Sequence, residues 1–581
     1  MRFVIAVALF VASLASLVFG FLLKGPLADH KDQAAHFKID TAYSYLFIPN
    51  DTLSKGTGKL TLTASGTDKV FYANARASDI QAWIGTSNFA TLTLSSTGLK
   101  TDVVTTEGIG ENANPANSDL WRSQLSVRSR LVTPVETDAD TGVLLASDGL
   151  HRAPTDVLLT WRQPELVNWP MILIVGGLVL LVAAFIANYL NWLHIRKLRG
   201  PRRRLPRAPK GPKGRRYRGK RAKADLPRRG RRSSTRRKVV ATALAVLTVA
   251  ALAGCSGSSS VTSASPSASA TPQSVSVVVT DDQLQRIVSN VVQAVTQGDD
   301  HRDVRAIQDR TAGPVYTIRK VHYTLQAKSK KIAKMPPLSA HPITIALPMQ
   351  LPDQSLGLGW QTRTIMVATK PASADALPQL LVLQQASPRE NYKLWYETDL
   401  LSGTDFPKVA AESVGAFTIK RTDSFLQVLP GQLPTIYGDV INKGSSSRHF
   451  GKFNLSGDQF YAQISEAQAA QKSDLTKAKA NIKFLHTLNS QNTIGLSTLN
   501  GGGLIAVAMN DQSIIHPTKR GAAVTVKLLE QQLLLGSTGS ATGLNISYCS
   551  MLLFYVPSLG SAESIRLLGA TQGLLNVSSI R

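Results

Sequence analysis

The residues that most restrict how this chain can fold lie in its middle, at positions 196–238. This stretch holds 22 Arg or Lys residues and a single acid, Asp225, so it carries +21 of the chain's formal charge of +27. An apolar run at 239–253 follows directly and is closed by Gly254 and Cys255. A basic region, a short apolar region, and small residues before a cysteine form the pattern of a bacterial lipoprotein signal, placed here inside the chain rather than at its start.

This pattern predicts a peptidase recognition box and a lipid attachment site. The box consists of Leu252, Ala253 and Gly254, and Cys255 supplies the thiol that would carry the lipid. Fifteen mostly apolar residues are short for a membrane span and typical of a signal. The alternative is a third spanning helix that ends in cysteine. If the box is cut, the products are residues 1–254 and a lipoprotein of residues 255–581. A further alternative is that the polypeptide joins two neighbouring reading frames.

Two longer apolar runs, at 1–23 and 169–193, predict transmembrane helices. About 20 residues at about 1.5 Å each cross the apolar core of a bilayer. The first run is either an uncleaved anchor or a cleaved signal peptide, and the lack of an Ala-x-Ala site favours the anchor. The second run is followed at once by Arg196 and Lys197. The excess of basic residues in cytoplasmic loops then predicts that 194–238 is cytoplasmic and that the folded domains are extracytoplasmic.

Alternating apolar and polar residues at 24–168, broken by Gly, Asn and Ser, predict a β-rich domain, most simply a sandwich. A Ser-, Ala- and Pro-rich tether is predicted at 256–279. Beyond it, Thr280 and Gln283 form a capping box before a run with helical spacing, and strand-like runs begin at 315–325. Similar residues recur at Ser456. We therefore expect tandem α+β domains at 280–410 and 456–581, joined by a linker at 411–455.

The charge and cysteine counts exclude some classes of protein. Two cysteines in 581 residues do not make a disulfide-stapled scaffold, and Cys549 is predicted to be a buried small hydrophobe. The basic segment contains one aromatic residue, Tyr217, so base stacking is hardly available. Its position between apolar runs favours contact with anionic membrane lipids over nucleic acid.

Four features together resemble a known group of proteins. They are the opening residues MRFV, residues 78–85 (SDIQAWIG), residues 114–121 (NPANSDLW), and the second apolar run with its basic tail. The group is an uncharacterised family of actinobacterial membrane-anchored proteins and lipoproteins, some of which carry the label glycosyl transferase. The half from 280 onward is similar to domains of the nuclear-transport-factor-two-like, or cystatin-like, kind. The resemblance implies an envelope location and offers no agreed active site.

Asp138 and Asp140 are the sole residues that fit the transferase label, because an acidic pair can hold a metal bound to a nucleotide sugar. Thr137, Thr141 and Gly142 surround them, which is typical of a surface turn. Common catalytic and phosphate-binding motifs are missing from the sequence, and the His residues lack metal-ligand spacing. No cofactor, metal or catalytic residue is therefore predicted. We expect a non-enzymatic protein that binds an envelope partner or ligand; the alternative is an enzyme of envelope glycan assembly.

Overall fold

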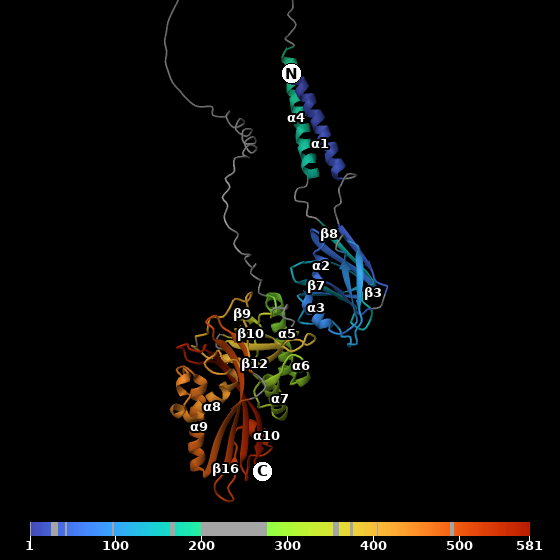
Figure 1. Ribbon diagram of the computed structural model, residues 1–581. Coiled ribbons are helices and arrows are strands. Elements are labelled where there is room, and N and C mark those ends of the chain that lie inside the picture. Colours follow the sequence, from blue (N-terminus) through green and yellow to red (C-terminus); the bar gives the residue numbers. More distant parts are fainter. Residues whose placement is uncertain are drawn as a thin grey trace, which may run out of the picture. The chain divides into compact units, whose positions relative to one another are not determined.

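The computed structural model describes residues 2–24, 33–40, 43–95, 98–162, 169–198, 276–352, 359–371, 373, 376–403, 405–488 and 493–581. The chain divides into two compact units, one of Met1–Asp29 with Val167–Gln273 and one of His30–Leu166 with Ser274–Arg581 (Figure 1). Most of the basic segment, the box of Leu252, Ala253 and Gly254, Cys255, and the tether up to residue 275 lie outside the described residues.

The first unit contains two long apolar helices, α1 (Arg2–Lys24) and α4 (Trp169–Leu198). Both are long and apolar enough to cross a membrane, as predicted, and they indicate membrane association. They pack antiparallel through small residues. The Ser16 hydroxyl donates to the Leu173 carbonyl at 2.8 Å, and a Cβ atom on Gly20 would come within 2.8 Å of the Ile174 side chain. Small residues allow this close approach of two apolar helices.

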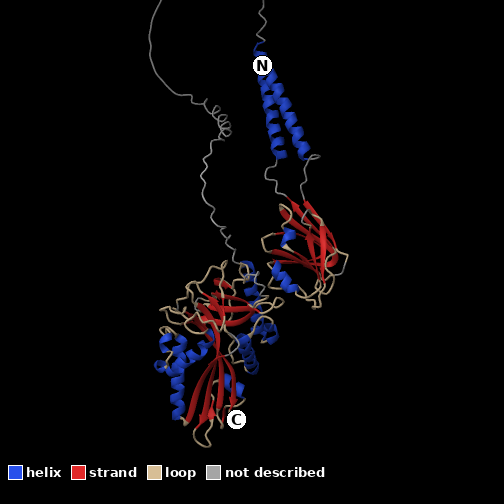
Figure 2. Cartoon of the chain, in the orientation of Figure 1, coloured by secondary structure: helices blue, strands red, loops and turns tan. Residues whose placement is uncertain are grey.

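The second unit begins with the β domain, residues 30–166, which is β-rich as predicted (Figure 2). Its elements in chain order are β1 (Gln33–Lys38), β2 (Tyr45–Ile48), α2 (Asn50–Leu53), β3 (Lys59–Arg76), α3 (Ala77–Ile84), β4 (Phe89–Leu94), β5 (Thr101–Thr106), β6 (Ser123–Val135), β7 (Thr141–Ala146) and β8 (Asp156–Arg162). They form one sheet in the order β1-β8-β3-β7-β2-β4-β5, with β6 paired to β3.

The long strand β3 explains why the sheet is not divided in two, as a sandwich would be. One edge of β3 pairs with β6 from Leu60 to Asn74. Its other edge pairs first with β8 and then with β7. The strand thereby links parts of the domain that a sandwich would keep in separate sheets. Alternation buries one core on each face of the sheet. One core includes Leu62, Leu159 and Trp161, and the other includes Trp121 and the α3 residue Trp83.

The second unit continues with the C-terminal module, residues 274–581, an α+β structure. Its helices are α5 (Asp281–His301), α6 (Val304–Gln308), α7 (Gly313–Lys328), α8 (Leu433–Lys443), α9 (Gln459–Lys477) and α10 (Leu529–Leu535). Its strands are β9 (Ile343–Pro348), β10 (Arg363–Thr369), β11 (Gln379–Gln385), β12 (Lys393–Leu400), β13 (Thr418–Ile419), β14 (Ala480–Leu488), β15 (Ile494–Ser497), β16 (Gly503–Pro517), β17 (Val524–Thr525), β18 (Gly539–Ser540), β19 (Leu544–Val556) and β20 (Arg566–Ser579).

One ten-stranded sheet runs through the module in the order β13-β15-β16-β19-β20-β12-β11-β10-β9, with β14 paired to β16. Each half contributes an antiparallel series of strands, and the two series meet at their last strands, where Asp399 lies opposite Ala570 and Leu400 opposite Gly569. One apolar core spans both halves, from Ile287 and Leu383 to Leu553. Cys549 is buried in this core, as predicted. The halves at 280–410 and 456–581 therefore share a sheet and a core, and their structural superposition stays a prediction.

Three local expectations differ from the structure. Residues 315–325, predicted as a strand, lie in α7. Arg319 is buried on the inward side of this helix, so a charged residue interrupts the apolar spacing that would have predicted a helix. The stretch 411–455, predicted as a linker, contains α8, whose Tyr437 and Val440 are buried in a second core. The capping box at Thr280 is confirmed, whereas α9 is capped by Asp458 rather than by Ser456.

Candidate docking interface

The candidate site is the set of polar contacts between the β domain and the C-terminal module, here called the docking interface. It begins at α3, which follows β3 without a loop. Ile80, Trp83 and Ile84 face the β-domain core, and the helix stops at Gly85, whose φ of +59° suits glycine. Asp79 lies in the first turn, where the helix dipole favours a negative charge, and it is buried at 2% exposure.

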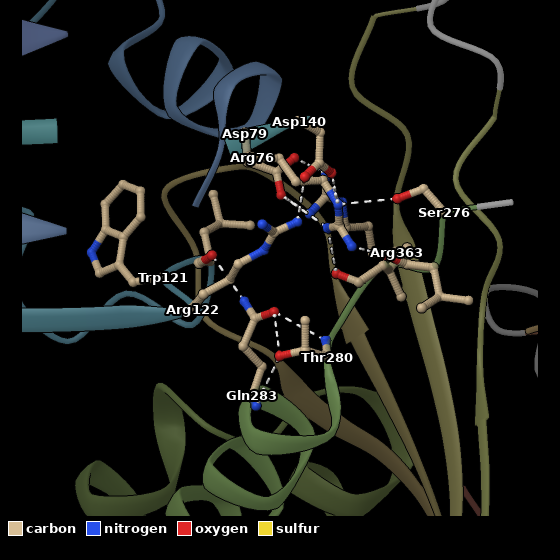
Figure 3. A network of polar contacts seen from close by, with 12 residues as sticks. Arg76, Asp79, Trp121, Arg122, Asp140, Ser276, Thr280, Gln283 and Arg363 are labelled. Carbon is tan, nitrogen blue, oxygen red and sulfur yellow. Dashed lines mark hydrogen bonds and ion pairs between the residues drawn. The ribbon is translucent and has the colours of Figure 1, made fainter. Parts of the chain in front are cut away.

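Two arginines surround the Asp79 carboxylate (Figure 3). Arg363, at the start of β10 in the module, binds both carboxylate oxygens, one of them at 3.0 Å. Arg76, at the end of β3, reaches the same carboxylate at 3.3 Å. All three side chains are almost fully buried. A two-pronged arginine–carboxylate contact is strong and directional, and a buried charge of this kind depends on its partners.

Arg76 also holds the point at which the chain enters the module. Its guanidinium donates to the carbonyls of Val277 and Val278 and to the Ser276 hydroxyl. Asp140 adds a second negative charge 3.3 Å from Arg76 Nε. Burial is the main reason that the pKa of Arg76 lies below its ordinary value; Asp79 opposes this effect and the charge of Arg363 adds to it.

A second group of contacts surrounds Asp119, in the loop before β6. The carboxylate accepts from Arg310, which lies between α6 and α7, and from the backbone N–H of Tyr392 at 2.8 Å. The backbone N–H of Asp119 donates to the Asn391 side chain at 2.9 Å. Asp119 is 1% exposed. The loop and the module thus satisfy each other's buried polar groups.

The first turn of α5 serves the helix and the interface together. The Gln283 side-chain oxygen accepts from the Thr280 backbone and so completes the capping box. Its nitrogen donates to the carbonyls of Asp119 and Leu120 at 3.2 and 2.9 Å. One turn later, Arg286 donates to the carbonyl of Trp121. Burial is the first cause that lowers the pKa of Arg286 below its usual range.

Arg389, in the turn between β11 and β12, closes the other end of α3. Its guanidinium donates to the carbonyls of Trp83 and Ile84, each at 2.8 Å, and to the carbonyl of Glu111 at 2.6 Å. The last carbonyls of a helix lack partners within the helix and carry partial negative charge. An arginine of the module therefore caps a helix of the β domain.

The structure places Asp138 and Asp140 in the turn between β6 and β7, where both acids face arginines. Arg122 lies 2.7 Å from Asp140 and 3.5 Å from Asp138. In the described part of the chain, no three His, Cys, Asp or Glu side chains come close enough together to hold a metal ion. A pocket beside β12, lined by Glu397, Asp399 and other residues, has a volume of about 40 Å³, which suits water rather than a sugar.

The comparisons with known proteins concern the module. A family described as "Domain of unknown function (DUF8094)" matches residues 275–579, more than half of the chain. The chain belongs to this family. The matched region covers nearly the whole module, which is therefore called the DUF8094 domain below. It begins one residue before Ser276, whose hydroxyl accepts a hydrogen bond from Arg76. No curated protein and no solved structure was found to match. The resemblance to membrane-anchored proteins labelled glycosyl transferase stays a prediction.

Sequence reasoning did not find the docking interface, although it singled out the right segments. Residues 78–85 form most of α3 with Asp79, and residues 114–121 contain Asp119 and end at Trp121. Both runs served only as family signatures. One signal could have indicated an interface: in each run an acid, Asp79 or Asp119, lies beside apolar residues and a tryptophan, in a domain without a catalytic motif. Their arginine partners in the DUF8094 domain lie between about 190 and 300 residues away in sequence, and no local pattern connects them.

Proposed function

We propose that this protein is a membrane-anchored envelope protein whose folded domains lie on the extracytoplasmic side and bind an envelope partner or ligand without catalysis. The observation that carries the proposal is the docking interface. The β domain lies between α1 and α4 in the chain. It contacts the DUF8094 domain through hydrogen bonds at Asp79, at Asp119 and at the end of α3. In this proposal the β domain anchors the DUF8094 domain near the membrane, where the DUF8094 domain binds the envelope partner or ligand.

The state of the buried acids supports binding over catalysis. A general acid or base needs a face open to substrate. The buried carboxylates of the described residues are instead occupied. Asp79 and Asp119 pair with arginines at the interface, and Glu397 pairs with Arg319 at 2.7 Å. The other two follow the same rule: Asp458 accepts from the Tyr437 hydroxyl, and Asp511 contacts the His486 ring and the Ser550 hydroxyl.

The proposed sidedness rests on charge. The basic segment follows α4 directly, and Arg196 and Lys197 form the end of that helix. Lys and Arg gather in cytoplasmic loops, so α4 would run with its carboxyl end inward and the β domain outside. Membrane lipids would then be the partners of the basic segment.

A protease test on spheroplasts examines this proposal. A tag at residue 581 is expected to be lost on protease treatment, whereas a tag inserted at residue 212 is expected to be protected until the membrane is opened. A protected tag at residue 581 would reject the extracytoplasmic placement. Membranes are also incubated with labelled nucleotide or lipid-linked sugars, for wild type and for Asp138→Ala/Asp140→Ala. Sugar transfer that depends on these acids would reject the binding function in favour of glycan assembly.

We further propose that Cys255 carries lipid and that the chain is cut before it, on the strength of Leu252, Ala253 and Gly254 and the short apolar run. Each buried acyl methylene adds about 0.8 kcal/mol to membrane binding, so two or three chains anchor a fragment. Immunoblots with tags at both ends should show two fragments for wild type and one band for Cys255→Ala. One full-length band for both, without lipid label, would show a third spanning helix instead.

A further inference from the structure

The β domain and the DUF8094 domain have separate hydrophobic cores. The two clusters of the β domain draw their buried residues from positions 35–161, and the three clusters of the DUF8094 domain draw theirs from 278–577. Among the described residues, the one hydrophobic side chain of the DUF8094 domain that packs against a β-domain cluster is Trp360. Bodies with their own cores are the ones that can fold and associate independently.

The contacts between these bodies are of the kind found between separate proteins. They include arginine–carboxylate pairs, arginine–carbonyl hydrogen bonds and an arginine beside Trp83, together with the hydrogen bonds of Gln283, Asn391 and Tyr392. Across the interface, Arg389 lies 5.3 Å from the ring centre of Trp83, and Trp360 packs against the same β-domain cluster. Within the DUF8094 domain, Arg363 stacks 4.1 Å above Trp360. Interfaces between separable partners are rich in Arg and Trp, and these residues dominate their binding energy.

Charge is distributed asymmetrically across the interface. The DUF8094 domain contributes Arg310 and Arg363, and the β domain contributes Asp119 and Asp79 as their acceptors. Arg286 of the DUF8094 domain binds the carbonyl of Trp121, and Arg389 binds the carbonyls of Trp83 and Ile84 at the end of α3. Such a pairing gives specificity to an encounter between two molecules.

From these observations we propose that the docking interface is a binding site that works between two polypeptides. The β domain is the membrane-held receptor, and its partner is a DUF8094 domain that needs no covalent link to it. Cleavage of the chain between 199 and 275, at Cys255 or elsewhere, then yields a stable two-chain complex. This inference rests on the proposed function in one respect only: both domains must lie on the same side of the membrane.

The experiment uses the full chain in detergent, with a specific protease site inserted between residues 265 and 266 and a tag at each end. After cleavage, the N-terminal tag is captured at about 1 μM protein, and the C-terminal tag is measured in the bound fraction. We expect the two fragments of the wild type to stay together. Arg389 occupies an exposed turn, so Arg389→Glu removes its contacts without disturbing a core, and it should weaken retention by about 30-fold.

The matched control is Arg520→Glu, the same charge change at an exposed position after β16. It should leave retention unchanged. Thermal unfolding of the captured and released fragments confirms that each variant is folded. Immediate separation of the wild-type fragments would overturn the inference, and so would full retention of folded Arg389→Glu. Neither result would contradict the proposed extracytoplasmic location. That location is tested separately, and protection of the tag at residue 581 in spheroplasts would reject it.

Discussion

The two junctions of the second unit are built in opposite ways. Within the DUF8094 domain, β12 and β20 join the two halves through backbone pairing, and buried apolar side chains from both halves fill one core. Between the DUF8094 domain and the β domain, side-chain charges make the contact, and the cores remain apart. The first junction makes one folding unit out of the two halves. The second leaves two folding units that recognise each other.

Replacing Asp79 should break the second junction alone. Asp79→Ala leaves Arg363 buried without its acid and leaves Arg76 with Asp140 alone, and removal of one partner of a buried pair costs about 3–5 kcal/mol. We expect the domains to separate while the DUF8094 domain keeps its own stability. Hydrogen exchange provides the measurement: the amides of Asp119 and Tyr392, which donate across the interface, should exchange faster.

The matched control is Asp102→Ala, which removes an exposed acid on β5 of the same domain. It should leave both amides protected. Faster exchange throughout β16 and β19 in Asp79→Ala would contradict the separation of the two junctions, because it would show that the DUF8094 domain unfolds with the interface.

A cavity in the shared core should test the first junction. Leu553 on β19 is fully buried among residues of both halves, so Leu553→Ala is expected to lower the free energy of unfolding by about 2–5 kcal/mol. Because the core is shared, denaturation should show both halves losing structure in one transition. Leu559→Ala, at a 70% exposed position, is the control and should change little. Two transitions, with only the later half shifted, would show that the halves are independent.

The smallest effect is expected at Asp399, which lies directly at the pairing of β12 and β20. Burial raises its pKa above the ordinary 3.8, although a hydrogen bond from Gln379 lowers it. The folded protein then holds this proton more tightly than the unfolded chain, so stability falls as pH rises through the raised pKa. Asp399→Asn removes this penalty and should raise stability at pH 7 by less than about 1 kcal/mol, given the partial exposure of the group.

The advantage of Asp399→Asn should disappear near pH 3, where the wild-type carboxyl is protonated in both states. Urea unfolding at the two pH values measures it. A variant that is less stable than wild type at pH 7 would show that the charge of Asp399 supports the junction rather than weakening it.

The sequence predicted the features that local patterns encode. Apolar runs predicted α1 and α4, alternation predicted the β-rich domain, and Thr280 with Gln283 predicted the start of α5. Prediction failed where a distant partner decides the local structure. Arg319 can be buried in α7 because Asp299 of α5 and Glu397 of β12 neutralise its charge. In the sequence alone, an arginine predicts an exposed position and not a buried one. The docking interface was missed for the same reason, since Asp79 and Arg363 meet only after both domains have folded.

The hold of Arg76 on Val277 and Val278 also has a mechanical consequence. These residues are fastened on the other side to the end of β9, where Val278 donates to the carbonyl of Met349 and Leu351 donates to that of Ser276. Tension applied to the chain ahead of Ser276 would load these bonds and Arg76 before it reached the first turn of α5. In force spectroscopy with a handle at residue 270, we expect Arg76→Ala to lower the first rupture force. Arg76 would thus transfer a force on the preceding chain to the β domain, so that the force does not act directly on α5.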